Sequence, residues 1–331
     1  MHSARIIGTG FSVPERVVTN DDLSKSMDTS DEWIRVRTGI QERHWVTEGE
    51  TGAGLAHAAS LKALEMAGVR ASELDAIIYA TTTPDHFAPG GGVFLQRLLD
   101  IPGIPALDIR MQCSGFIYAL SLARAWIATG EFQRILVVGA EVQSTGMDVT
   151  TRGRNTAVIF ADGAGAAVVA RSEQPDRGLL AFDLHCDGRH AELLWVDKPG
   201  SMYHPRVSVE QVAEGKHFLS MDGKEVYRHA VTTMPASVRA VLKKTGNSVE
   251  DISLLLPHQA NLRISEAVQK ELNLRDDQVY NNIQRYGNTT AATIPILLDE
   301  CVRAGRVKDG QLLVFTAFGS GFSWGSVAVR W

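Results

Sequence analysis

The chain has 331 residues, of which 44% are hydrophobic and 21% are charged, and its formal net charge is −5 at pH 7. The length allows one large domain or two ordinary ones, and the acidic balance argues against a general nucleic-acid binder. No apolar run approaches the roughly 18 residues of a membrane span, and residues 1–15 lack the charged and apolar segments of a signal peptide. We therefore expect a cytoplasmic protein that binds neither nucleic acid nor a membrane.

In chain order, short apolar segments rich in Val, Ile and Leu alternate with helical patterns. Strands are predicted at 76–82, 134–141, 164–170, 252–258 and 311–319, and the clearest helices at 54–68, 116–130 and 232–246. Continuous apolar strands between helices are typical of sheets that are covered on both faces. The sequence therefore predicts an α/β protein.

The order of the predicted elements recurs within the chain. Residues 63–85 run helix, turn, strand in the same way as residues 241–261, and residues 113–141 follow the same plan as residues 288–319. This weak internal repeat predicts two similar α/β halves, 1–174 and 175–331.

The repeat places three polar residues at turns that belong to different strands. Cys113 begins the second helix of the first half, Asn288 begins the matching helix of the second half, and His258 follows a strand of the second half. Loops at the carboxyl ends of strands hold the ligand sites of α/β sheets. If the halves pack about a pseudo-twofold axis, these three side chains converge.

The three residues suit the chemistry of acyl transfer. A thiol at a helix N-terminus is expected to have a lowered pKa, so Cys113 is a candidate nucleophile, and nearby N–H groups would bind an oxyanion. His258 and Asn288 each offer a hydrogen-bond donor, and two neutral donors aimed at one oxygen would stabilise an enolate. Taken singly, Cys113 fits a buried hydrophobe, His258 a structural histidine and Asn288 a helix cap.

The other two cysteines, Cys186 and Cys301, are interpreted as buried hydrophobes. The three cysteines are far apart in the sequence and include no C-x-x-C pair. We therefore expect neither a disulfide framework nor a structural zinc site.

Six segments in order carry a resemblance to a known family. They are "TSDEWIRVRTGIQERHW" (29–45), "CSGFIYAL" (113–120), "FADGAGAAVV" (160–169), "LLPHQANLRI" (255–264), "RYGNTTAATIP" (285–295) and "FGSGFSWGS" (318–326). Over nearly its whole length the chain resembles 3-oxoacyl-[acyl-carrier-protein] synthase III, a condensing enzyme of the thiolase superfamily. The resemblance implies the thiolase fold, a five-layered αβαβα duplication, in a homodimer.

The resemblance also implies a reaction, the one that initiates type II fatty-acid synthesis. Cys113 would carry an acyl group taken from acyl-CoA, while His258 and Asn288 hold the carbonyl of malonyl-acyl-carrier protein as it loses CO2. The products would be 3-oxoacyl-acyl-carrier protein, CoA and CO2. The family's oxyanion hole falls on Ser320, and Phe318 matches the aromatic residue beside the malonyl group. Acyl-CoA is a substrate, and no cofactor or metal is implied.

Further residues match the family's binding sites. For coenzyme A these are Trp33 and Arg37, which match the adenine-stacking and phosphate-contacting pair, Arg152 as the second basic flank, and Asn261 along the tunnel. For docking of the acidic acyl carrier protein they are Arg228, Arg263 and Lys270, each of which fits a plain solvated helix face nearly as well.

Departures from the family pattern concern the primer. Ala88, next to Phe87, stands where the short-primer type has a Phe that closes the acyl pocket across the dimer interface, so a deeper pocket is expected. The segment 193–218 is longer than in that type. We therefore expect a primer longer or bulkier than acetyl. "LDIRMQCSG" and "RGRN" are shared with the branch that makes alkylquinolone signals, so the alternative is a secondary-metabolite condensing enzyme with an anthraniloyl or other specialised primer.

Two more distant alternatives are a papain-like Cys-His-Asn hydrolase and a non-catalytic acyl-binding subunit. The hydrolase is disfavoured because the papain-like signature around the cysteine is absent and the α/β duplication does not fit that fold. The subunit is disfavoured because all three reacting residues are present.

Overall fold

The computed structural model describes residues 2–331, and its two main sheets are built from separate parts of the chain. The first sheet has the strand order β1-β7-β6-β4-β5 and the second the order β11-β12-β13-β8. The strands are β1 (Ser3–Ser12), β4 (Ala76–Ala80), β5 (Ala106–Ile109), β6 (Arg134–Glu141), β7 (Gly163–Ser172), β8 (Gly178–Cys186), β11 (Leu254–Pro257), β12 (Leu312–Gly319) and β13 (Ser323–Arg330). The sheets thus divide between the two predicted halves, while a domain boundary at residue 174 stays a prediction.

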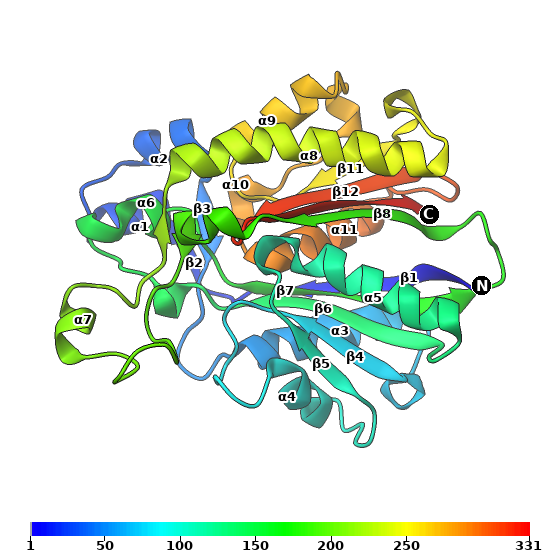
Figure 1. Ribbon diagram of the computed structural model, residues 1–331, viewed down its shortest axis with the longest axis horizontal. Coiled ribbons are helices and arrows are strands. Elements are labelled where there is room, and N and C mark those ends of the chain that lie inside the picture. Colours follow the sequence, from blue (N-terminus) through cyan, green and yellow to red (C-terminus); the bar gives the residue numbers. More distant parts are fainter. Residues whose placement is uncertain (1) are drawn as a thin grey trace.

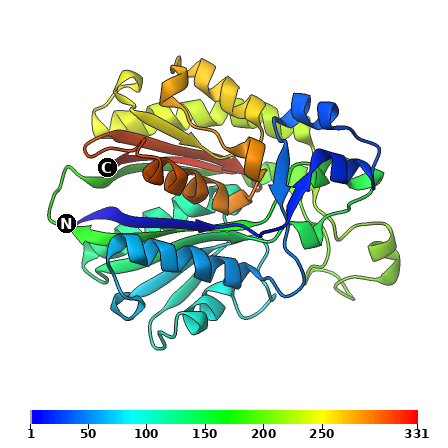
Figure 2. The ribbon, with the colours of Figure 1, turned by 180° about the vertical axis from the view of Figure 1, so that it is seen from behind.

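Helices form the other three layers. α3 (Gly52–Ala67) and α4 (Gly91–Leu98) cover the outer face of the first sheet, and α8 (Gly223–Thr245) and α9 (Leu262–Glu271) cover that of the second. α5 (Gly115–Thr129) and α11 (Thr293–Arg303) lie between the sheets, as Figure 1 and the view from behind in Figure 2 show. One cluster of buried apolar side chains joins the central helices to both sheets, and one further cluster lies between each sheet and its outer helices. The five-layered αβαβα order that the resemblance implies is confirmed.

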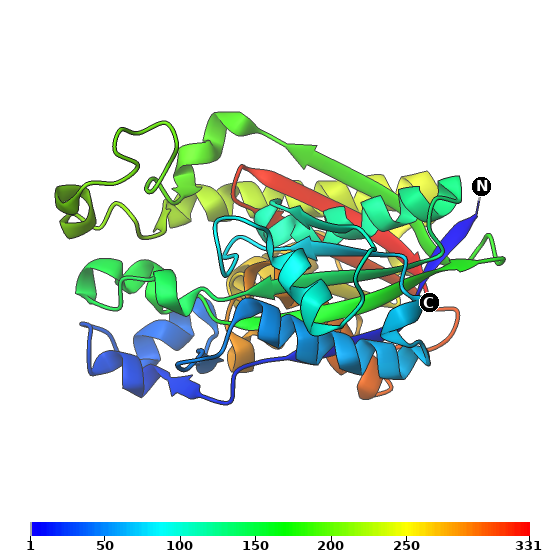
Figure 3. The ribbon, with the colours of Figure 1, turned by 90° about the horizontal axis from the view of Figure 1, so that it is seen from below.

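The smaller elements gather toward the end of the molecule that lies away from both termini (Figure 1). They are α1 (Asn20–Ser24), α2 (Asp31–Thr38), α6 (Arg154–Ala157), α7 (Val209–Ala213), α10 (Ile283–Tyr286), the pair β2 (Val17–Thr19) and β3 (Glu42–His44), and the pair β9 (Leu194–Trp195) and β10 (Ser220–Met221). Figure 3 shows that the chain between β9 and β10, which carries α7, projects from the body at this end.

The sequence of α5 explains why Cys113 lies deep in the molecule. The helix is rich in small and apolar residues, and Gly115, Phe116, Ile117, Ala119 and Leu120 are all buried. A helix that is apolar on most of its surface packs between two layers rather than on the outside. Its N-terminal end, where Cys113 stands, is therefore enclosed between the two sheets.

The helix predicted at 232–246 is confirmed as the second part of α8, which begins earlier, at Gly223, with an exposed polar turn capped by Asp222 and continues through Pro235. One expectation about local structure is wrong, the burial of Cys186. Cys186 is exposed at the last residue of β8, whereas Cys301 is buried as expected. Within residues 2–331, none of the helices combines the length and the apolar character needed to cross a membrane.

Candidate active site

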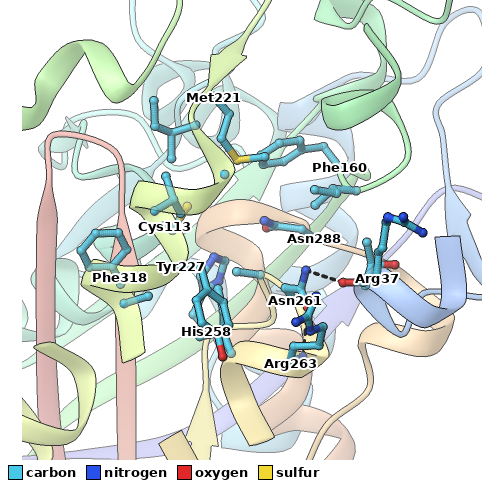
Figure 4. A pocket seen from close by; sticks show the side chains of 18 of the residues that line it. Arg37, Cys113, Phe160, Met221, Tyr227, His258, Asn261, Arg263, Asn288 and Phe318 are labelled. Atoms are coloured by element: carbon cyan, nitrogen blue, oxygen red, sulfur yellow. Dashed lines mark hydrogen bonds between the residues drawn. The ribbon is translucent and has the colours of Figure 1, made fainter. Parts of the chain in front are cut away.

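The structure brings Cys113, His258 and Asn288 together in one cavity of about 560 Å³. The three side chains come from different elements of both halves and face one another at its inner end (Figure 4). Most of the remaining lining is apolar: Val158, Ile159, Phe160, Leu194, Met221, Val226, Ala230, Met234, Ile264 and Phe318. The mouth is basic, with Arg37, Lys224 and Arg263. The cavity therefore suits a long ligand with an anionic outer end and a reactive inner end.

Cys113 lies in a single 3-10 turn, Gln112–Ser114, between β5 and α5. Gln112 has a φ of 45°, a conformation that is uncommon for a residue with a side chain. Such strain is found where the chain must turn sharply to present a functional group. The turn places the thiol at the start of a buried helix.

The thiol is neutral at pH 7. Burial raises the pKa of Cys113 to about 12, and the nearby Glu141 carboxyl adds to the rise, whereas the backbone N–H groups of Ser320 and of Cys113 itself lower it. The expected lowering of this pKa at the helix N-terminus is therefore wrong, because loss of hydration between the sheets outweighs the hydrogen bonds from these two N–H groups. The two N–H groups that point at the sulfur are those that the resemblance implies for the oxyanion hole.

His258 follows β11 and is only 2% exposed. Its backbone N–H donates to the Thr316 carbonyl at 2.8 Å, and its Nδ1 lies 2.7 Å from the Thr293 hydroxyl. Its Nε2 is buried and has no hydrogen-bond partner among the described residues. Burial lowers the pKa of His258 to about 3, so the ring is neutral at pH 7.

Asn288 lies in a turn that is held in place by backbone hydrogen bonds to the chain before β7. Its N–H donates to the Ile159 carbonyl at 2.9 Å, and its carbonyl accepts from the Ala161 N–H at 3.0 Å. Its side-chain Oδ1 accepts from the Thr290 N–H at 2.9 Å, as a capping Asn would. Because the oxygen is occupied, the side-chain NH2 group is the part of Asn288 that is available to a ligand.

A fully buried carboxyl, Glu141 at the end of β6, was not predicted as part of the site. It accepts hydrogen bonds from the hydroxyls of Thr82 and Thr83 at 2.8 and 2.6 Å, and from the Ala291 N–H at 3.4 Å. Burial raises the pKa of Glu141 to about 7. It joins the turn after β4 to the turn that carries Asn288. The one signal in the sequence was an acid at the carboxyl end of an apolar strand.

At the mouth, two guanidinium groups lie over the ring of Trp33. Arg37 lies 4.3 Å and Arg154 4.6 Å from the centroid of the Trp33 ring. Asn261 caps α9 by accepting from the Arg263 N–H at 3.0 Å, and its Nδ2 donates to the Arg37 carbonyl at 2.9 Å. Trp33, Arg37 and Asn261 thus lie where the resemblance puts them, on the cavity wall.

The structure does not bring Arg152 to this mouth. Its Nε donates to Asp148 at 2.5 Å, and its NH1 donates to the Ala213 carbonyl of α7 at 3.3 Å. It lines a separate hollow against the projecting segment. Arg154, two residues later, takes the place beside Trp33 that was expected for Arg152. The sequence "TTRGRNT" has no feature that selects one arginine over the other.

The residues expected around the reacting groups divide into two sets. Phe318 lines the cavity and packs against Phe322, with ring centroids 4.8 Å apart, and the hydroxyl of Ser320 donates to the Leu194 carbonyl. Phe87 and Ala88 do not line the cavity, and Phe87 is 71% exposed. Within one chain, the guanidinium of Arg206, in the projecting segment, lies 5.3 Å from the centroid of the Phe87 ring. These two residues therefore reach an acyl pocket only if it belongs to another copy of the chain.

The three residues expected to dock a carrier protein are all exposed, but they differ in position. Arg263 stands at the cavity mouth, 5.9 Å from the Tyr227 ring. Arg228 is paired with Glu225 at 2.5 Å, and Lys270 is in the last turn of α9, away from the mouth. Lys224, which the sequence analysis did not single out for docking, lines the mouth as well.

The layered duplication, with a cysteine, a histidine and an asparagine in one deep cavity, defines a condensing enzyme of the thiolase type. Family models described as 3-oxoacyl-[acyl-carrier-protein (ACP)] synthase III match residues 107–188 and, for its C-terminal part, residues 242–331. The Beta-ketoacyl-[acyl-carrier-protein] synthase III of Xanthomonas campestris pv. campestris is 48% identical, over 99% of this chain and 98% of its own. That of Xylella fastidiosa is 46% identical, with the same coverage. The chain belongs to the 3-oxoacyl-[acyl-carrier-protein] synthase III family and is an acyltransferase.

Solved structures agree with this assignment. The 3-oxoacyl-[acyl-carrier-protein] synthase III of Aquifex aeolicus has a TM-score of 0.91 at 43% identity, over 99% of this chain and 100% of that chain. The priming beta-ketosynthase of the R1128 polyketide biosynthetic pathway has a TM-score of 0.90 at 33% identity, over 99% of this chain and 96% of that chain.

Proposed function

We propose that the protein joins an acyl-CoA primer to malonyl-acyl-carrier protein by decarboxylating condensation and so initiates type II fatty-acid synthesis. The observation that carries the proposal is that the cavity holds one thiol and two nitrogen atoms, Nε2 of His258 and Nδ2 of Asn288, that no described residue engages. Such a site offers one nucleophile and two groups for a single carbonyl oxygen.

In the first step, the sulfur of Cys113 attacks the thioester carbonyl of acyl-CoA. The oxyanion is bound by the N–H groups of Cys113 and Ser320, which already point at the sulfur. The carbon–sulfur bond to coenzyme A breaks, and the proton of the Cys113 thiol leaves with the coenzyme A thiol. The product is an acyl thioester on Cys113.

In the second step, His258 and Asn288 bind the thioester carbonyl of malonyl-acyl-carrier protein. Loss of CO2 leaves an enolate, and two neutral donors stabilise its oxygen in a site with little water. The enolate carbon then attacks the acyl carbonyl on Cys113. The bond to Cys113 breaks, its sulfur takes up a proton, and 3-oxoacyl-acyl-carrier protein is released. By this route the enzyme needs no cofactor or metal.

Substrate binding follows from the charges at the mouth. The adenine of coenzyme A would stack at Trp33, with Arg37 and Arg154 beside its phosphates, and the pantetheine arm would run along the apolar wall to Cys113. The phosphopantetheine of the carrier protein would enter the same way. Arg263, together with Arg228 and Lys270, would contact the acidic carrier protein. Because these substrates are cytoplasmic, a cytoplasmic location is part of the proposal.

A homodimer is also part of the proposal. β5 pairs only with β4 in the first sheet, so its other edge presents backbone N–H and C=O groups. Leu107 on this edge and Val93 and Leu98 on α4 are exposed apolar side chains. Pairing of β5 with its copy would cover them and carry the loop of Phe87 and Ala88 toward the other protomer.

The primer is proposed to be longer or bulkier than acetyl, because Ala88 leaves room where the short-primer type has a Phe. The alternative, a specialised condensing enzyme, is supported by the likeness to the R1128 priming ketosynthase. The proposal of a longer or bulkier primer is tested by measuring, by intact mass, how well a panel of straight, branched and aromatic acyl-CoAs acylates Cys113. Efficient loading by acetyl-CoA alone contradicts this proposal. To distinguish the specialised condensing enzyme from the fatty-acid enzyme, turnover is measured with malonyl-acyl-carrier protein and with malonyl-CoA, each with aliphatic and with aromatic primers.

A further inference from the structure

A short chain of hydrogen bonds lies behind the imidazole of His258. Nδ1 of His258 is 2.7 Å from the hydroxyl oxygen of Thr293, which in turn lies 3.1 Å from the carbonyl oxygen of Thr290. All three residues are buried. The Thr290 carbonyl also accepts the backbone N–H of Thr293, at the junction with α11.

The ring carries a single proton, and the hydroxyl has only one proton to donate. Burial lowers the pKa of His258 to about 3, so the ring is neutral at pH 7. In one arrangement the proton is on Nδ1, and Thr293 accepts it and donates to Thr290. In the other the proton is on Nε2, and Thr293 donates to Nδ1. The two arrangements give Nε2 opposite roles, as an acceptor or as a donor.

Two observations favour the second arrangement. The Thr290 carbonyl already has the Thr293 N–H as a partner and does not need the hydroxyl proton. A separation of 2.7 Å is typical of a hydroxyl donor and shorter than the usual 2.9–3.0 Å of an N–H donor to oxygen, whereas the longer 3.1 Å contact is the weaker one.

We infer that Thr293 is a positioning residue that donates its hydroxyl proton to Nδ1 of His258 and thereby keeps the ring proton on Nε2. The Nε2–H then faces the cavity beside the NH2 group of Asn288. This inference rests on the proposed function. In that reaction the enolate oxygen would meet two hydrogen-bond donors, rather than the donor of Asn288 and an unprotonated Nε2 of His258. Thr293 touches no substrate and acts only through His258.

Nitrogen-15 NMR of the histidine-labelled, full-length enzyme tests the inference directly. The signal of His258 is identified by its absence from the His258→Gln spectrum. We expect a protonated Nε2 and an unprotonated Nδ1 in the wild type and in Thr293→Ser. A proton on Nδ1 in the wild type overturns the inference, whatever the enzyme's activity.

A kinetic test uses Thr293→Val, which keeps the shape of the side chain and removes the hydroxyl, against Thr293→Ser. We expect Thr293→Val to lower the release of CO2 from malonyl-acyl-carrier protein about tenfold, while loading of Cys113 changes less than about twofold, and Thr293→Ser to retain the wild-type rate. Equal rates for Val and wild type, or a slow Ser variant with a normal melting temperature, contradict the inference. A wild-type enzyme that releases no CO2 would instead contradict the proposed function and leave the NMR result standing.

Discussion

Gly319 at the end of β12 lies directly against Cys113, in the other half of the molecule. A Cβ on Gly319 would lie 2.8 Å from the Cβ, 2.9 Å from the backbone nitrogen and 3.2 Å from the sulfur of Cys113. Only a residue without a side chain fits this approach. The contact brings the N–H of the next residue, Ser320, toward the sulfur, so the oxyanion hole depends on how closely the two halves meet.

Replacement of Gly319 by Ala is therefore expected to push the two halves apart at the nucleophile. We predict that Gly319→Ala lowers the free energy of unfolding by about 1–3 kcal/mol and slows the loading of Cys113 at least tenfold. Urea unfolding and stopped-flow loading measure the two effects. Gly146→Ala is the control, because its new Cβ would meet no atom within 4 Å. If Gly319→Ala and Gly146→Ala have similar unfolding free energies and similar loading rates, the close contact between Gly319 and Cys113 is not what limits this position.

The two neighbouring arginines are expected to differ in their effect on coenzyme A binding. Arg154 stacks on Trp33 at the mouth, whereas Arg152 is tied to Asp148 outside it. We predict that Arg154→Ala raises the KM for acyl-CoA about five- to tenfold with little change in kcat, and that Arg152→Ala changes it less than about twofold. Steady-state kinetics with acyl-CoA as the varied substrate give the KM and kcat of each variant. A larger effect for Arg152 would restore the role that the sequence suggested for it.

Stability should depend on pH through Glu141. Its pKa is raised from 4.5 to about 7 by burial, so the folded protein holds a proton that the unfolded chain releases. Its contribution to stability is complete below about pH 4.5 and is lost as the pH rises to about 7, by at most about 1.4 kcal/mol per pH unit. Urea unfolding of the wild type against Glu141→Gln across this range measures the loss. If the free energy of unfolding changes with pH in the same way for both proteins, Glu141 does not carry the proton that this prediction requires.

Chain-length preference should respond to residue 88. If the loop of Ala88 closes the acyl pocket of the other protomer, Ala88→Phe narrows that pocket. We predict that loading of medium-chain acyl-CoA falls about tenfold relative to acetyl-CoA. Competition between the two primers, read by intact mass, gives the ratio directly, and Phe87→Ala is the companion variant for the neighbouring position. An unchanged ratio for Ala88→Phe places the acyl pocket elsewhere.

Apolar strands between helices predicted an α/β protein, and the resemblance to the family predicted its five layers. The repeat linked Cys113 with Asn288, and His258 joined them as a third polar residue at a strand end. The pKa of Cys113 could not be predicted in this way, because it depends on burial by β12 and on Glu141, both distant in the sequence. The choice between Arg152 and Arg154 depends on how a loop turns, which two arginines separated by one residue do not reveal. Thr293 shows its role only through its distance to His258.

The most direct test of the account is a two-stage experiment on Asn288→Ala, read by intact mass. The enzyme is first loaded with acyl-CoA and then given malonyl-acyl-carrier protein, with Cys113→Ala as the control. We predict that Asn288→Ala gains the acyl mass at nearly the wild-type rate and then retains it, with condensation slowed about 100-fold or more, while Cys113→Ala gains no mass. An Asn288→Ala enzyme that fails to load although folded, or a Cys113→Ala enzyme that still loads, would contradict the division of labour between the thiol and the two nitrogen groups.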